Sequence, residues 1–189
     1  FINLTPVMQS SGINEIVDSE IYFKCENFQK VGAFKFRGAT NAVLSLNETD
    51  MKNGVATHSS GNHAAALSLA AKRRGIKAYI VMPKTAPGVK VEAVKGYGGE
   101  IIFCEPTLQA REETLEKVVQ KTGATFIHPY DNYKIIEGQA TAALELFEHV
   151  FDIDLVMAPV GGGGLMSGTA LSVSSLSPKT KIIGVEPAG

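Results

Sequence analysis

Four consecutive glycines, Gly161 to Gly164, form the stretch of this sequence best suited to bind an anion. Ordering glycine costs more backbone entropy than ordering any other residue, so a fold that orders four in a row needs a compensating interaction. The apolar run 154–158 before them and the small-residue segment 165–175 after them predict a strand, a glycine turn and a helix. Because such a turn directs free backbone N–H groups and the positive end of a helix dipole at one point, we predict a phosphate site.

The spacing of these glycines excludes two common phosphate-binding motifs. A dinucleotide-binding turn needs a glycine where Met166 and Ser167 stand, and a P-loop needs a lysine where this chain has Thr169. A flexible linker is the structural alternative, but linkers are seldom bracketed by a buried strand and an amphipathic helix. The phosphate therefore belongs to some other kind of ligand.

Lys35 is the residue that could react with the carbonyl group of such a ligand. Taken alone, a lysine on an amphipathic helix is usually a surface cation. Phe34 and Phe36 flank it, however, and apolar surroundings destabilise the charged amine, which makes it a better nucleophile. A phosphate site together with a desolvated lysine is what pyridoxal phosphate requires, since one holds its phosphate and the other forms a Schiff base with its aldehyde. This cofactor is the leading candidate.

The polar run Ser59-Ser60-Gly61-Asn62-His63 offers two hydroxyls, an amide and an imidazole at a predicted strand-to-helix turn. Its free N–H groups could hold a carboxylate, whereas a helix N-cap needs only one such residue. No G-x-S-x-G or S-x-x-K motif accompanies these serines, which disfavours nucleophilic hydrolysis. The four histidines have no metal-binding spacing. We therefore predict a binding site for a carboxylate ligand.

Strands and helices that alternate along the chain must position these groups. This alternation predicts a parallel sheet with helices on both faces, and ligands in such folds lie at the carboxyl ends of strands, where 59–63 and 161–164 both fall. The predicted strands are 20–26, 54–58, 78–82, 100–104, 125–128, 154–158 and 181–186, and the predicted helices are 33–44, 64–74, 87–95, 108–121, 135–150 and 165–175.

Composition argues against several classes of partner. The formal net charge is −1, and the largest basic cluster, Lys72-Arg73-Arg74 before Gly75, is typical of a helix C-terminus, so we expect neither nucleic acid nor membrane as a partner. Cys25 and Cys104 lack a CxxC spacing, which predicts a reducing, cytoplasmic environment. The first residue is not methionine and the last stretch stops just after an apolar run, so we expect a fragment of a longer protein.

Four motifs occur in the order and spacing of one known family. They are Ala33–Ala39, Ser59–His63, Gly138-Gln139 and Pro159–Gly164, and the chain resembles the serine racemase and threonine/serine dehydratase family of fold-type II pyridoxal-phosphate enzymes nearly end to end. The resemblance implies an α/β fold with two open, mainly parallel twisted sheets flanked by helices. It also implies a large domain, 1–53 with 132–189, and a small mobile domain, 54–131.

The resemblance suggests a role for each motif. Lys35 resembles the Schiff-base lysine, Phe34 a neighbour of the cofactor ring, and Asn62 the residue that hydrogen-bonds the ring hydroxyl. The residues that match the phosphate loop are Gly161, Gly162, Gly163, Gly164 and Leu165. The residues that match substrate-binding positions are Ser59, Ser60, Asn62, His63, Tyr97 and Arg111.

Ser60 bears on the reaction. In the racemase-like branch a serine here faces the Schiff-base lysine across the substrate Cα, so that one group removes the proton and the other returns it from the opposite face, whereas many threonine dehydratases have alanine. The resemblance thus implies racemisation of serine, with elimination of water from hydroxy amino acids to a keto acid and ammonia. The alternatives are a dedicated threonine, serine or 3-hydroxyaspartate ammonia-lyase and, from another class, a non-catalytic phosphate- or nucleotide-binding domain.

Further properties come from the resemblance alone. It implies a homodimer and a divalent cation, Mg²⁺ or Ca²⁺, for which Glu186 matches the first ligand and the other ligands would follow Gly189. Ala65 stands where the family commonly has a glutamine that is associated with nucleotide activation in some members. This departure puts activation by ATP in question.

Overall fold

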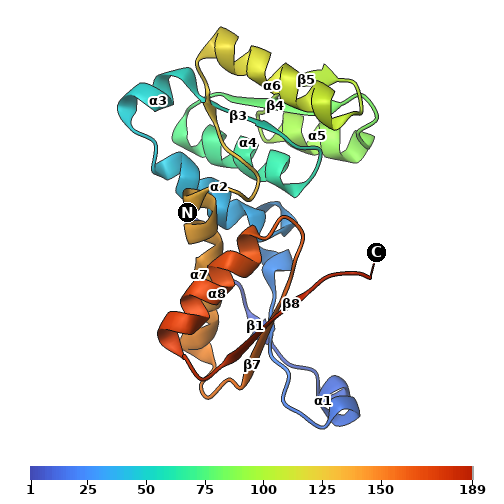
Figure 1. Cartoon of the computed structure of the whole chain (residues 1–189), viewed down its shortest axis with the longest axis vertical. Helices are drawn as coiled ribbons and strands as arrows, with labels where there is room; N and C mark the ends of the chain where they lie inside the picture. Colours follow the sequence, from blue (N-terminus) through green and yellow to red (C-terminus); the bar gives the residue numbers. More distant parts are fainter. Residues whose placement is uncertain (189) are drawn as a thin grey trace.

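The structure is a computed structural model that describes residues 1–188. Figure 1 shows an upper lobe built on a sheet and a lower lobe that contains long helices and the last strands of the chain, with α2 (Lys35–Leu44) between them. Among the described residues, no helix is both long enough and apolar enough to cross a bilayer.

The sheet of the upper lobe is entirely parallel. Its strand order is β5-β4-β3-β6, from β5 (Glu100–Cys104), β4 (Ala78–Pro83), β3 (Val55–His58) and β6 (Thr125–Phe126). The two central strands are buried along nearly their whole length, because helices cover both faces of the sheet. The carboxyl end of β3 therefore delivers residues 59–63 to one edge of the sheet.

Alternate residues of the central strands face different helices. Val55, Ile80 and Met82 pack in one core with α4 (Asn62–Arg74) and α5 (Gly88–Gly96). Ala56 and Val81 pack in a second core with α6 (Leu108–Thr122). This two-residue alternation is what a strand covered on both faces requires.

The ends of these helices follow local capping rules. Thr107 caps α6, as predicted, by accepting a hydrogen bond from the Ala110 N–H at 3.1 Å. α4 ends at Gly75, whose φ of +73° is left-handed, after the basic triplet predicted for a helix C-terminus. Pro87 was predicted inside α5, but it is the N-cap, with an extended ψ of 134°, and α5 begins at Gly88.

The lower lobe is built on helices that pack closely. α7 (Tyr133–His149) crosses α2 (Lys35–Leu44) where two glycines meet, and a Cβ added to Gly138 would lie 2.5 Å from the Gly38 Cα. The Gly38 N–H also donates to the Gln139 Oε1 at 3.1 Å. α8 (Gly164–Leu176) packs on α7, and β7 (Leu155–Pro159) pairs in parallel with β8 (Lys181–Val185).

The N-terminal segment departs most from the sequence-based prediction. The strand predicted at 20–26 is reduced to β2 (Phe23–Lys24), which pairs antiparallel with β1 (Val7–Met8). Two short helices were not predicted, namely α1 (Ser11–Val17) and α3 (Glu48–Asn53). Neither helix has a buried residue. The sequence therefore lacks, in both segments, the apolar periodicity by which helices are predicted. Two 3-10 turns, η1 (Glu26–Phe28) and η2 (Lys30–Gly32), lead into α2.

The predicted α/β class, with parallel strands flanked by helices, is confirmed. All four strands of the upper sheet fall within the predicted small domain, 54–131. The exact border between the two domains and the mobility of the smaller one stay predictions.

Candidate active site

The segment 127–132, between β6 and α7, brings the predicted groups together. The Lys35 Nζ donates to the Pro129 carbonyl at 2.8 Å, and the His63 Nε2 lies 3.3 Å from the Ile127 carbonyl. The ring of Tyr130 lies against Gly162, where an added Cβ would approach it to 2.1 Å. Lysine, serine loop and glycine loop, which are far apart in the sequence, therefore converge on neighbouring residues.

Lys35 projects from the first turn of α2 and is half-buried. Burial lowers the pKa of its amine below the ordinary value of 10.5, as predicted from its apolar surroundings. Phe34 lies near the amine, with its ring centroid 5.3 Å from the Nζ. Phe36 does not share this role: its side chain is fully buried in the core, with Lys30 and Arg73 over its ring.

The serine loop lies at the N-terminus of α4. The Ser59 N–H donates to the Val81 carbonyl at 3.1 Å, which continues the strand pairing, and the Gly61 N–H donates to the Ser59 Oγ at 3.3 Å. Gly61 is the N-cap of α4, and no side chain caps this helix. Capping therefore does not explain the polar run, and the first N–H groups of α4 are available to an anionic group.

Asn62 and His63 differ in environment. Asn62 is exposed, and its Oδ1 accepts a hydrogen bond from the Lys90 Nζ at 3.2 Å. His63 is buried, and its burial, followed by the positive charge of Lys35, lowers its pKa to about 3. The imidazole is therefore neutral at pH 7, and its Nδ1 has no hydrogen-bond partner within residues 1–188. A buried nitrogen without a partner is suited to contact a ligand.

The glycine loop at the start of α8 has the geometry expected for a phosphate site. Gly163 is the N-cap, with a left-handed φ of +88° that only glycine adopts readily, and no side chain caps the helix. Gly161 and Gly163 face open space, whereas Gly162 and Gly164 lie against Tyr130. The N–H groups in the first turn of a 13-residue helix are thus free of side chains, and Leu165 follows on this turn.

The structure brings Arg111 near the carboxyl end of β3, whereas Tyr97 lies at the end of α5. Arg111 lies in the first turn of α6, and its charge helps to lower the pKa of His58, the last residue of β3, although burial is the larger cause. Tyr97 is the C-cap of α5, and the preceding Gly96 carbonyl accepts from Lys72 in the last turn of α4. Ten residues, or about 15 Å of helix, separate that turn from Asn62. The substrate-binding role of Tyr97 stays a prediction.

Glu186 does not form a metal site with its neighbours. It is exposed and follows β8, and no group of three or more His, Cys, Asp or Glu residues in the described part of the chain could hold a metal ion. The predicted divalent cation stays a prediction.

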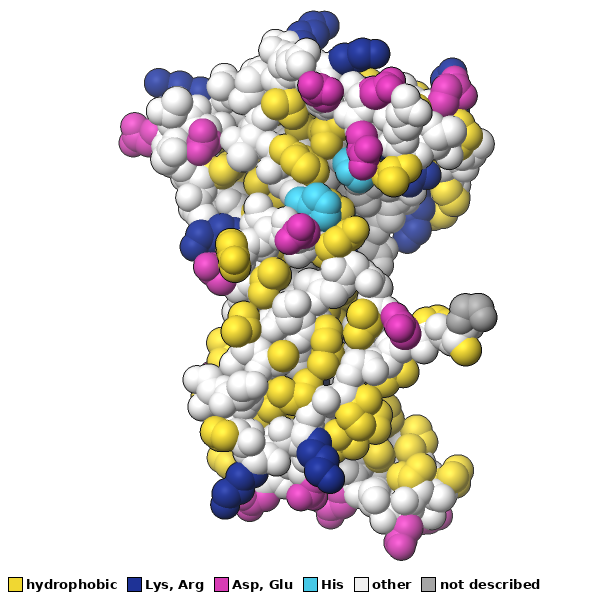
Figure 2. Space-filling view, viewed as in Figure 1, with side chains coloured by type: hydrophobic (Ala, Val, Ile, Leu, Met, Phe, Trp, Pro, Cys, Tyr) yellow, Lys and Arg dark blue, Asp and Glu magenta, His cyan; other side chains and the backbone are white. Residues whose placement is uncertain are grey.

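Aromatic side chains line the approach from the sheet to the glycine loop. The rings of His58 and Phe126 stack at 6.1 Å, Phe126 meets His128 at 5.7 Å, and His128 meets Tyr130 edge-on at 4.6 Å. Figure 2 shows the histidines of this face gathered on the upper lobe among apolar side chains. The contacts of Ile127, Pro129 and Tyr130 were not predicted, since only the turn-like sequence between a strand and a helix marked this segment.

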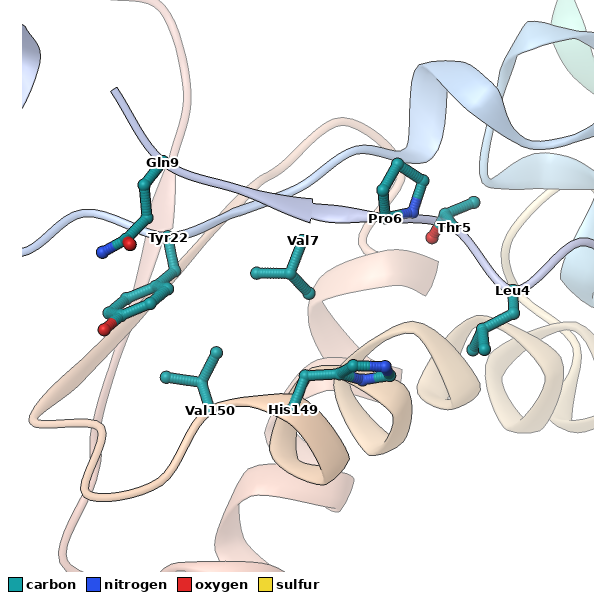
Figure 3. A pocket seen from close by; sticks show the side chains of 8 residues that line it. All are labelled: Leu4, Thr5, Pro6, Val7, Gln9, Tyr22, His149 and Val150. Carbon is teal, nitrogen blue, oxygen red and sulfur yellow. The ribbon is translucent and has the colours of Figure 1, made fainter. Parts of the chain in front are cut away.

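A groove of about 450 Å³ elsewhere on the lower lobe contains none of the predicted site residues. It lies between the β1 segment and the end of α7 (Figure 3), and its lining is Leu4, Thr5, Pro6, Val7, Gln9, Tyr22, His149 and Val150. The candidate site is therefore the junction at 127–132 rather than this groove.

Comparison with known proteins agrees with this geometry. The profile of the family described as "Pyridoxal-phosphate dependent enzyme" matches residues 1–189. The chain belongs to this family. Pyridoxal phosphate is accordingly the cofactor against which the candidate site has to be tested.

Relatives within the pyridoxal-phosphate dependent enzymes include racemases and dehydratases. The chain is 55% identical over its whole length to a serine racemase of Arabidopsis thaliana, and it spans 57% of that protein. Over 98% of its length it is 53% identical to a beta-hydroxyaspartate dehydratase of Paracoccus denitrificans, of which it spans 59%. It superposes on the structure of maize serine racemase with a TM-score of 0.99 at 49% identity. The superposition covers 100% of this chain and 57% of the maize chain.

The residues at the junction fit pyridoxal phosphate. The glycine loop offers free helix N–H groups for a phosphate, and Lys35 offers an amine with a lowered pKa for an aldehyde. Tyr130 lies beside the glycines, and the adjacent Pro129 carbonyl accepts a hydrogen bond from the Lys35 amine, so the glycine loop and this amine contact adjacent residues of the segment.

Proposed function

We propose that the protein containing this chain racemises serine and also eliminates water from serine and other small hydroxy amino acids to give a keto acid and ammonia. The carrying observation is that Lys35, the serine loop and the glycine loop converge on segment 127–132. The similarity to serine racemases over the whole chain supports this choice of reaction.

Each group has a role that its chemistry suits. Bound pyridoxal phosphate supplies an electron sink for the negative charge that develops at the substrate Cα when its proton leaves. The Lys35 Nζ would attach the cofactor and exchange a proton with Cα on one face, and we assign the Ser60 Oγ to the other face. Phe34 would lie beside the cofactor ring, Asn62 would contact the ring hydroxyl, and residues 161–165 would hold the phosphate.

The remaining groups bind the substrate. The Ser59 hydroxyl, the Asn62 amide, the His63 imidazole and the free N–H groups of α4 would hold its carboxylate. Arg111, half-buried at the carboxyl edge of β3, would add positive charge nearby. We also propose Glu186 as one ligand of a divalent cation, a homodimeric assembly and a cytoplasmic location.

Substitution of Ser60 distinguishes a racemase from a dedicated ammonia-lyase. We expect Ser60→Ala to lower the rate of L-to-D serine inversion by about 10²-fold or more, because one proton donor is lost, while pyruvate formation from L-serine continues. Chiral chromatography and a keto-acid assay measure the two rates in one incubation. Ammonia release without inversion in the wild type and the variant alike would support the lyase.

The alternative of a non-catalytic binding domain predicts a different absorbance spectrum. A phosphate- or nucleotide-binding domain would stay colourless after addition of pyridoxal phosphate, whereas the proposed enzyme gains a visible absorbance band that shifts on borohydride reduction. A colourless protein would therefore overturn the proposed reaction and leave only the phosphate site.

A second candidate function is elimination from 3-hydroxyaspartate. Two observations favour it. One is the beta-hydroxyaspartate dehydratase among the relatives, and the other is the position of Lys90, whose Nζ donates a hydrogen bond to Asn62 at the serine loop. We propose that the Lys90 ammonium contacts the second carboxylate of such a substrate.

Lys90→Gln tests this assignment. The kcat/KM for 3-hydroxyaspartate should fall about 10-fold, as expected for one charge-assisted hydrogen bond, while that for serine changes less than about 2-fold. Lys95→Gln, on the same helix but in an exposed ion pair with Glu92, is the matched control. Equal losses for both substrates would exclude a contact with the second carboxylate.

A further inference from the structure

Arg37 is a fully buried cation two residues after Lys35. Its side chain has no exposed area, and its guanidinium makes two hydrogen bonds to each of two carboxylates. The distances to Glu26 are both 2.7 Å, and those to Glu145 are 2.6 and 2.7 Å. The Thr5 and Thr141 hydroxyls accept further bonds at 3.2 and 3.1 Å. All three nitrogens of the guanidinium therefore donate hydrogen bonds.

Lys24 completes the network and balances its charge. Its Nζ lies 2.7 Å from the Glu145 carboxylate and donates to the Thr5 carbonyl at 2.7 Å. Two cations thus face two carboxylates, all with side chains no more than 15% exposed. Burial acts to raise the pKa of Glu145, but hydrogen bonds from Arg37 and Lys24 hold it below its ordinary value, so the Glu145 carboxylate is ionised at pH 7.

The network joins four separate parts of the chain to the first turn of α2. Thr5 precedes β1, Lys24 ends β2, Glu26 begins η1, and Thr141 and Glu145 lie on α7. Two residues correspond to about 200° around a helix, so Arg37 and Lys35 project to nearly opposite sides of the same turn. Arg37 points to the network while Lys35 points to the Pro129 carbonyl.

No side chain caps the start of this turn. The N-cap of α2 is Phe34, which makes no side-chain capping bond, and Val31 just before it has a left-handed φ of 60°. A helix end without a cap frays readily. A buried ion network is also a poor source of stability, since apolar residues of similar volume often serve as well. A gain in position explains the network better than a gain in stability.

We propose that the network of Lys24, Glu26, Arg37 and Glu145 positions the Lys35 amine, by fixing the first turn of α2 from the side opposite the cofactor. This inference rests on the proposed function, because it takes Lys35 as the reactive amine. Arg37 is a positioning residue here and contacts neither substrate nor cofactor.

The test measures Lys35 itself in cofactor-free protein. Trace acetylation across a pH series, read by peptide mass spectrometry, gives the pH midpoint at which the Lys35 amine becomes reactive. We expect Glu26→Gln and Glu145→Gln to shift this midpoint upward by about one pH unit, toward 10.5, because a loosened turn exposes the amine to water. The nearby His63 and His128 are unchanged in these variants, so they do not cause the shift.

A matched control and a volume-conserving variant separate position from stability. Glu137→Gln removes an exposed carboxylate that pairs with Lys134 on the same helix, and the Lys35 midpoint should not move. The variant Lys24→Met, Glu26→Gln, Arg37→Met and Glu145→Gln removes all four charges and should regain stability without restoring the midpoint.

The outcome is decisive whether or not the protein catalyses the proposed reaction, since labelling needs no cofactor. A wild-type midpoint in the single variants, or in a folded fourfold variant, would overturn the positioning role. A shifted midpoint together with no cofactor attachment would retain the positioning role and overturn the proposed function instead.

Discussion

Lys35→Ala is expected to lower both racemisation and elimination by about 10³-fold or more, because the variant lacks the amine that attaches the cofactor and exchanges the Cα proton. Only one neutral hydrogen-bond acceptor, the Pro129 carbonyl, loses its partner, so the stability should change by only about 1 kcal/mol. Assays with L-serine and a denaturation curve of the same preparation measure both quantities.

Lys30→Ala is the matched control for this substitution. Lys30 also has a pKa lowered by burial and by Arg73, but it lies over the Phe36 ring, away from the glycine loop. Activity should persist in Lys30→Ala, and borohydride should trap the cofactor on Lys35 in that variant. Trapping on any lysine other than Lys35 would refute the assignment.

Gly138→Ala is expected to destabilise the protein by about 3 kcal/mol, which is the upper range for overpacking. The added Cβ would lie 2.5 Å from the Gly38 Cα and 2.7 Å from the Arg37 carbonyl, and these backbone atoms have no rotamer by which to move away. α2 would have to separate from α7, and Lys35 lies in the first turn of α2. Urea unfolding of the cofactor-free protein measures the loss.

Gly96→Ala is the matched control, because it makes the same chemical change at a helical glycine with open space around it. No atom lies within 4 Å of an added Cβ at Gly96, the last residue of α5. Alanine also has a higher helix propensity, so a gain of up to about 0.5 kcal/mol is expected. Similar unfolding curves for the two variants would show that the close crossing of α2 and α7 does not limit stability.

Local signals in the sequence predicted most elements of the upper lobe. β5 occupies the predicted residues 100–104, and α6 begins at the predicted Leu108 after its Thr107 cap. Apolar periodicity and capping residues act over a few positions, which is why they are readable from the chain alone. α1 and α3 bury no side chain, so the same signals missed them.

The candidate site divides in the same way. Residue type and local order predicted a glycine loop, a lysine among apolar neighbours and a polar loop, and the similarity to a known family suggested their roles. The contacts between them depend on packing. Tyr130 reaches Gly162, and Pro129 reaches Lys35, only because α2, α7 and the upper sheet meet at segment 127–132.

What the sequence by itself determined is therefore which groups are present: an amine, a run of four glycines and a polar loop, the last two at the ends of strands. Tertiary structure alone decided which residues support that chemistry. Arg37 had no assigned role in the sequence because its partners Glu26 and Glu145 are 11 and 108 residues away. Burial and distance are properties of the folded chain, and no local pattern encodes them.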